Sequence, residues 1–166
     1  MKRILVLMMF LPMLCGCVTQ IKYESVEDVY SSDLLLPGEI CVSLPMDAVA
    51  LTASTDTREQ LYFCEGYTVT VQTLDGGDLD RSLREITGFG KSSLTVFETS
   101  RDGMRCVSCV WTSLGETGDQ VGRLVLLDDG DYHYAVSVMT DADLAGSLGH
   151  EWDDLLGCVT VARIGS

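Results

Sequence analysis

Four β-prone stretches follow one another in the second half of this chain, and they constrain its fold more than any other feature. They are residues 94–100 (LTVFETS), 104–113 (MRCVSCVWTS), 121–127 (VGRLVLL) and 132–139 (YHYAVSVM). The connections between them are short, and they contain Asp102-Gly103, the stretch 115–119 and Asp129-Gly130. Because glycine-bearing turns of this length join antiparallel neighbours, the sequence predicts a four-stranded β-meander.

A helix is predicted just before the meander. Leu79, Leu83 and Ile86 are spaced by four and three residues, which places them on one helical face. Asp78 can cap the N-terminus of this helix, and Gly88 can end it.

A second helix is predicted after the meander, where Thr140 and Asp141 offer an N-cap. Four large apolar residues then recur on one helical face: Leu144, Leu148, Trp152 and Leu155.

Three further segments are β-prone. Residues 39–44 and 48–54 are separated by a short Pro-Met-Asp connection and predict an early hairpin or a bent strand. Residues 60–74, where apolar residues alternate with threonines, predict a strand with one wet face. Residues 158–164 predict a closing strand.

This order of elements predicts an α+β fold in which helices pack on an antiparallel β-sheet. The outline resembles the α/β/α sandwich of the photosystem II extrinsic proteins of the PsbP type and their non-photosynthetic bacterial relatives. Three features carry this resemblance: the predicted hairpin at residues 122–138, the Leu/Trp helix after it, and the closing strand CVTVARI. The resemblance implies an accessory protein that docks on other proteins, and no catalytic residue carries over from it.

The N-terminus has the order of an export signal, with Lys2 and Arg3 followed by an uncharged run and then Gly16 and Cys17. As a helix, the run from residue 4 to 14 would rise only about 16 Å, roughly half of the hydrocarbon core of a bilayer. A permanent transmembrane span is therefore not expected.

The stretch Leu14, Cys15, Gly16, Cys17 resembles the lipobox of bacterial lipoproteins. The resemblance implies a diacylglyceryl group on the Cys17 thiol, cleavage after Gly16 and acylation, for example by palmitate, of the new amine. An ordinary signal peptide and a metal site are the alternatives, but no histidine lies near enough to complete a metal site. We expect a signal peptide at 1–16, a tether at 17–37 and a single domain at 38–166.

Removal of the signal leaves 9 basic residues against 25 acidic ones, a formal net charge of about −16. This charge repels phosphate backbones and anionic headgroups, so we expect no nucleic-acid partner and a domain that stands away from the bilayer. Solubility is the simpler explanation of the acidity, and recognition of a cationic partner is the other.

Five cysteines besides Cys15 and Cys17 make an odd number for an exported chain: Cys41, Cys64, Cys106, Cys109 and Cys158. Any disulfide scheme among these five therefore leaves at least one cysteine unpaired. Cys41 and Cys64 are the first pair to test for a disulfide, because both fall in predicted neighbouring strands. Reduced, buried thiols are the alternative.

Other stretches resemble chemical motifs without matching them. Residues 88–93 (GFGKSS) lack the first glycine of a phosphate-binding loop. Cys106 and Cys109 have the spacing of a redox pair, but on a strand they point to opposite faces. The carboxylates at 75–80 and 128–131 do not fit a calcium loop, although weak divalent binding stays open.

His133 and His150 are the only histidines and hence the candidates for a general base. We expect His133 on the strand face opposite Tyr132 and Tyr134, and His150 in solvent or at a helix cap. Neither is expected to be catalytic.

We therefore expect a lipid-anchored, extracytoplasmic binding or accessory protein of the bacterial cell envelope, without enzymatic activity, cofactor or metal. Its partners would be the inner or outer membrane, through the lipid on Cys17, and a protein that contacts the sheet face or the groove beside the last helix. The aromatic candidates for this contact, most of which are also suited to the core, are Trp111, Trp152, Tyr132 and Tyr134. Two alternatives stay open: a small hydrolase that uses His133 or His150, and a carrier of a small ligand or cation.

Overall fold

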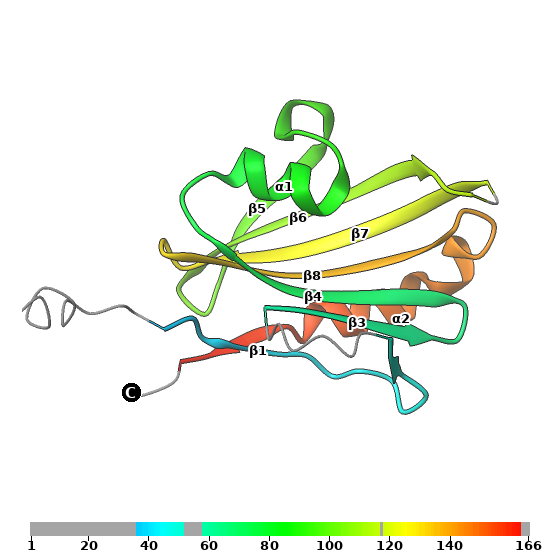
Figure 1. The fold of residues 1–166 in the computed structure, drawn as a ribbon, viewed down its shortest axis with the longest axis horizontal. Helices are drawn as coiled ribbons and strands as arrows, with labels where there is room; N and C mark the ends of the chain where they lie inside the picture. The colour runs from blue at the N-terminus through cyan, green and yellow to red at the C-terminus, as the bar shows by residue number, and fades with distance from the viewer. Residues whose placement is uncertain (1–35, 52–57, 117, 164–166) are drawn as a thin grey trace, which may run out of the picture. The chain divides into compact units, whose positions relative to one another are not determined.

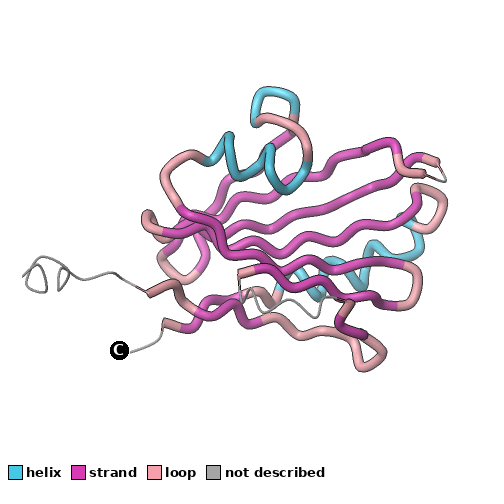
Figure 2. Tube along the Cα trace, in the orientation of Figure 1, coloured by secondary structure: helices cyan, strands magenta, loops and turns pink. Residues whose placement is uncertain are grey.

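The computed structural model describes residues 36–51, 58–116 and 118–163 (Figure 2). Their elements in chain order are β1 (Glu39–Cys41), β2 (Val49–Ala50), β3 (Glu59–Cys64), β4 (Tyr67–Asp75), α1 (Leu79–Thr87), the 3-10 turn η2 (Lys91–Ser93), β5 (Thr95–Arg101), β6 (Met104–Leu114), β7 (Asp119–Asp128), β8 (Tyr132–Asp141), α2 (Ala145–Gly157) and β9 (Thr160–Ala162). The signal peptide and most of the tether expected from the sequence lie outside the described residues.

Seven strands form one antiparallel sheet in the order β2-β3-β4-β8-β7-β6-β5. The predicted meander is confirmed as β5 to β8. Asp102 and Gly103 form the two-residue turn between β5 and β6, with φ angles of 51° and 79°. Both angles are positive, which is the geometry that favours an Asp-Gly pair in a tight hairpin.

The two helices cover opposite faces of this sheet, with α1 in front and α2 behind in Figure 1. A small second sheet, formed by β1 and β9, packs on the same face as α2. The predicted fold class, an antiparallel sheet with helices packed on it, is confirmed.

The predicted first helix is also confirmed. The side chain of Asp78 accepts a hydrogen bond from the backbone N–H of Arg81 at 3.2 Å, and Gly88 ends the helix with a φ of 81°. Leu83 is fully buried against the sheet. Burial of a leucine contributes roughly 1.5–3 kcal/mol, so this side chain is a main anchor of α1.

The second helix begins later than predicted. Thr140 and Asp141 do not cap it, because β8 continues through both residues and pairs there with β7. Leu144 precedes the helix and is 42% exposed, whereas Trp152 and Leu155 are buried as expected. Strand pairing is favoured here over the local capping signal.

The first half of the sheet differs from the prediction in two ways. Residues 60–74 form a hairpin rather than one strand, because Glu65 and Gly66 make a turn in which Gly66 has a φ of 83°. The predicted early hairpin is wrong as well, since β1 pairs with β9 and β2 pairs with β3.

The sheet separates two apolar clusters. On the α2 face, Trp152 packs edge-on against Tyr67, with ring centroids 6.1 Å apart. On the α1 face, Trp111 lies over Gly122, its partner on β7, which leaves no room there for a side chain. Among the described residues, no helix is long and apolar enough to span a bilayer.

Candidate functional site

His133 lies in the core between β8 and α1, on the face opposite Tyr134, as predicted. Its ring is 1% exposed. Nδ1 lies 2.7 Å from the Oγ of Ser82, which belongs to the buried face of α1. This contact links the helix to the sheet through two polar groups that would otherwise be buried without a partner.

Asp128 lies on the other side of the imidazole. It is the β7 partner of His133, and its Oδ1 is 3.8 Å from His133 Nε2, beyond hydrogen-bond distance. Burial lowers the pKa of His133, more than the nearby carboxylate of Asp128 raises it. The three residues have the composition of a catalytic triad, but the base is sealed from solvent.

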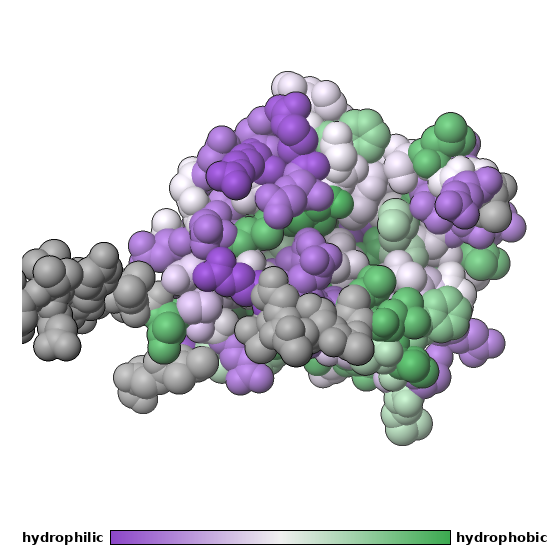
Figure 3. All heavy atoms as spheres, in the orientation of Figure 1, coloured by the Kyte–Doolittle hydropathy of each residue, from purple (hydrophilic) through white to green (hydrophobic). Residues whose placement is uncertain are grey.

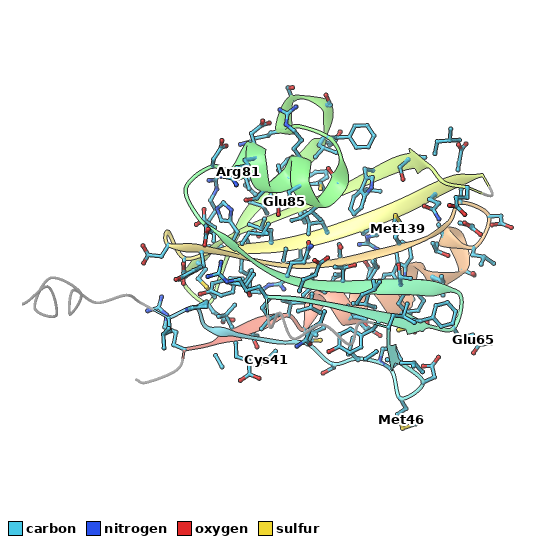
Figure 4. All side chains as sticks on the ribbon, in the orientation of Figure 1. Cys41, Met46, Glu65, Arg81, Glu85 and Met139 are labelled. Carbon is cyan, nitrogen blue, oxygen red and sulfur yellow. The ribbon has the colours of Figure 1, made fainter. Side chains whose placement is uncertain are left out.

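A polar pocket of about 220 Å³ opens beside Ser82, between α1 and the edge of β3 and β4. Arg81 and Glu85 line it from the helix (Figure 4), Asp75 lines it from the end of β4, and Arg58 lines it from just before β3. Arg58 and Asp75 form an ion pair of 3.3 Å. Charges of both signs face this pocket, which suits a small zwitterionic ligand better than a simple cation or anion.

His150 is not part of this arrangement. Its side chain on α2 is 89% exposed, and its Nδ1 lies 3.4 Å from Asp154 one turn later. A hydrogen bond with its own backbone and the charge of Asp154 raise its pKa. The structure thus places the two candidate histidines on different layers, in line with the predicted solvated position of His150.

All five cysteines among the described residues are free. The prediction that Cys41 and Cys64 fall in neighbouring strands is wrong. Cys41 is exposed on β1, whereas Cys64 is buried on β3 of the other sheet. Cys106 and Cys109 point to opposite faces of β6, as predicted, and enter different apolar clusters.

The carboxylates of residues 128–131 stabilise a turn. Asp129 accepts hydrogen bonds from the backbone N–H of Tyr132 at 2.8 Å and from the hydroxyl of Tyr134 at 2.9 Å. Burial raises the pKa of Asp129, but these bonds outweigh it and leave the pKa lowered. The same hydroxyl accepts from the backbone N–H of Gly38, which ties the start of the domain to β8.

The remaining motif-like stretches also have structural roles. Gly88 ends α1, and Lys91 begins the 3-10 turn that leads to β5, so residues 88–93 form a helix stop. Within the described part of the chain, no group of three or more His, Cys, Asp or Glu side chains could hold a metal ion.

The aromatic contact candidates are mostly core residues. Trp111, Trp152 and Tyr134 are buried, and only Tyr132 is half-buried among the four. Large apolar side chains are instead exposed at the ends of the sheet, and these were not singled out from the sequence: Val49, Leu51, Phe63, Phe97, Val110 and Leu114.

A groove of about 330 Å³ lies beside α2, where the sequence led us to expect one. Phe97 and Val110 form its outer wall and Leu156 its helix side. Arg123 and Asp153, which form an ion pair of 2.6 Å, lie at its rim. The groove exists because α2 packs on β7 and β8 and leaves the β5–β6 end of that face open.

Sequence reasoning did not identify Ser82 or the pocket next to it. A signal was present, since Ser82 follows Leu79 by three residues and precedes Leu83 on the buried face of the helix. A polar residue on such a face needs a partner. His133 can be identified as this partner only from the position of α1 on the sheet.

No protein-family model and no curated protein matches this sequence. Its fold is similar to that of the cyanobacterial PsbP protein (CyanoP) from Synechocystis sp. PCC 6803, with a TM-score of 0.54 and 8% identity over 81% of this chain and 99% of that one. It is equally similar to a protein from Bacteroides thetaiotaomicron VPI-5482, with a TM-score of 0.54 and 11% identity over 80% of this chain.

The chain spans only 48% of the length of the Bacteroides protein. A weaker likeness is to LpqN, involved in cell envelope biogenesis of Mycobacterium tuberculosis, with a TM-score of 0.49 and 12% identity over 80% of this chain and 87% of that one. At these identities the likeness concerns the fold alone, and the fold is the PsbP-like one that the sequence led us to expect.

Proposed function

We propose that this chain is a lipid-anchored protein of the bacterial cell envelope that acts by binding another protein outside the cytoplasm. The observation that carries the binding role is the incomplete cover of the sheet. The helices pack on its middle strands, while both ends present large apolar side chains to solvent, such as Phe63 and Phe97. Grouped apolar side chains of this kind mark interaction surfaces.

The location in this proposal rests on the N-terminal sequence. A diacylglyceryl group on Cys17 together with an acylated amine would anchor the chain stably, whereas a single acyl chain binds a membrane marginally. Residues 18–37 would then tether the acidic domain away from the headgroups.

Metabolic labelling with a palmitate analogue tests the anchor. We expect the wild type to be labelled and to fractionate with membranes. Cys17→Ser removes the acceptor thiol and abolishes the label, whereas the neighbouring Cys15→Ser keeps it. Labelling of C17S, or loss of the label in C15S alone, would contradict acylation at Cys17.

The binding role is tested by a photocrosslinking residue placed in the full chain in its own cells. We expect defined crosslinked products from position 97 at the groove. Position 84 is the control, because the side chain of Arg84 on α1 is 64% exposed and lies outside the groove. Equal products from both positions would argue against a specific contact.

The hydrolase alternative is favoured by one observation, the contact between Ser82 and His133. It predicts that Ser82→Ala, or alanine at both His133 and His150, abolishes the cellular function. The binding proposal predicts that S82A keeps this function. Labelling of Ser82 by a fluorophosphonate would favour the hydrolase.

A further inference from the structure

One corner of the seven-stranded sheet carries a group of exposed large apolar side chains. We call it the β2–β3 corner and define it by four residues, whose exposed fractions are 106% for Met46, 59% for Val49, 54% for Leu51 and 49% for Phe63. Hydrophobic residues gather there in Figure 3. Met46, at the tip of the connection between β1 and β2, points away from the sheet (Figure 4).

Three of the corner's residues, Val49, Leu51 and Phe63, lie on one face of the sheet, and Met46 lies in the connection before β2. Val49 on β2 is directly opposite Phe63 on β3, so the two side chains lie together. The residue before Phe63 on β3, Tyr62, packs into the core under α2. Because side chains alternate along a strand, Phe63 lies on the other face. The apolar cluster under α1 is built from β5 to β8, so the helix leaves this corner uncovered.

The corner is held in place by a hydrogen bond between two turns. The backbone N–H of Glu65, in the turn between β3 and β4, donates to Oδ2 of Asp47 at 3.0 Å. The backbone N–H of Leu51 donates to the carbonyl of Leu61 at 2.8 Å and extends the pairing beyond β2. A fixed surface loses little conformational freedom when it binds a partner.

The charges around the corner have one sign. Asp47 and Glu65 are exposed beside it, and residues 44–51 and 59–70 contain no lysine or arginine among the described residues. Arg58 precedes β3 at the opposite end from Phe63 and pairs with Asp75. The groove beside α2 differs, because Arg101, Arg123 and Asp153 all line it.

We propose that the β2–β3 corner binds an apolar segment of a partner protein that is flanked by lysine or arginine. Apolar side chains of this segment cover Val49 and Phe63, and its cations face Asp47 and Glu65. The acidic rim disfavours a second copy of this chain and anionic lipid headgroups, which carry the same sign of charge. This inference rests on the proposed binding function and names the chemistry of the partner.

The test is a titration of the purified, acylated full chain in neutral detergent with three synthetic amphipathic peptides. One has an apolar leucine face flanked by lysines, the second replaces lysine by glutamate, and the third replaces leucine by serine. We expect the leucine–lysine peptide to bind at least about tenfold more tightly than either of the others. Equal binding of the first and third would mean charge attraction without a corner site and would overturn the proposal.

Variants of the full chain locate the binding. We expect Phe63→Ser to weaken the leucine–lysine peptide about tenfold or more, and Glu65→Lys to weaken it several-fold with a smaller salt dependence. Leu114→Ser is the control, because it removes a large apolar side chain that is 85% exposed at the end of β6 and lines neither the corner nor the groove beside α2, and it leaves the affinity unchanged. Loss in L114S with no effect in F63S would place binding elsewhere and overturn the proposal.

The other occupants give different results. If F63S changed the sedimentation of the chain alone, the corner would bind a second copy of this chain. If F63S lost binding to phosphatidylglycerol vesicles but kept its affinity for the leucine–lysine peptide, the corner would bind a lipid surface. Either outcome overturns the proposed partner. Acylation and membrane fractionation are measured separately, so failure of the corner is distinguishable from failure of the proposed function.

Discussion

The buried imidazole of His133 couples the stability of the fold to pH. Its pKa is lowered from 6.5 by burial, so the unfolded chain binds the proton first as the pH falls below about 6.5. Stability therefore decreases from that pH downward, with a limiting slope of about 1.4 kcal/mol per pH unit for one proton. His133→Gln removes this contribution to the slope, which denaturant unfolding between pH 7 and pH 5 measures.

His150→Gln is the control for that measurement. The pKa of His150 is raised, so its contribution to stability is present below 6.5 and is lost as the pH rises. This direction is opposite to that of His133. If H133Q retained the full slope of the wild type, the buried histidine would not be the group that titrates.

The five cysteines differ in their access to solvent and in their reactivity. Cys41 and Cys158 are exposed, whereas burial raises the pKa of the Cys64 thiol and raises that of Cys109 to about 11. We expect iodoacetamide to label Cys41 and Cys158 in the native chain and the other three only after denaturation. Mass spectrometry of the labelled peptides measures this. A Cys41–Cys64 disulfide would instead protect both until a reductant is added.

The face of His133 could be predicted from the sequence, because alternation along a strand needs only the strand itself. Its partner could not, because Ser82 lies 51 residues earlier and on another element. The polar pocket beside Ser82 has the same origin, since Arg58 before β3 and Arg81 on α1 line it together only in the folded chain.

At the scale of elements, the pairing of β6 with β7 depends on a glycine. A Cβ on Gly122 would overlap the indole of Trp111. We expect Gly122→Ala to destabilise the fold by about 1–3 kcal/mol, because the tryptophan must leave its packed position. Thermal or urea unfolding checks this value.

Gly146 in α2 is the matched control, since nothing lies within 4 Å of the position of its Cβ. Gly146→Ala should be neutral or stabilise the helix slightly. The cost of G122A should also fall when Trp111 is changed to valine. An undiminished cost in that double variant would mean that the glycine is needed for another reason.

Elements with local signals were predictable, and those that depend on distant pairing were not. The meander and α1 carry their own turns and caps, such as Asp102-Gly103 and Asp78. In contrast, β1 and β9 are three residues each and pair from opposite ends of the domain. The turn at Gly66 was missed because the alternation of residues continues on both sides of it.

For the whole molecule, composition indicates a folded acidic domain, and the order of elements indicates its layers. Which parts of the sheet stay uncovered depends on the length and position of each helix. The exposed corner around Phe63 and the groove beside Phe97 therefore emerge only from the structure. They support a binding role through surfaces that no sequence motif marks.

The central claim, a binding domain anchored outside the cytoplasm by its seventeenth residue, is tested most directly by the intact mass of the chain recovered from membranes. The account predicts a polypeptide that begins at Cys17 and carries the added mass of a diacylglyceryl group and an amide-linked acyl chain. A chain that still begins at Met1, or one that begins near residue 17 without acyl mass, would contradict it.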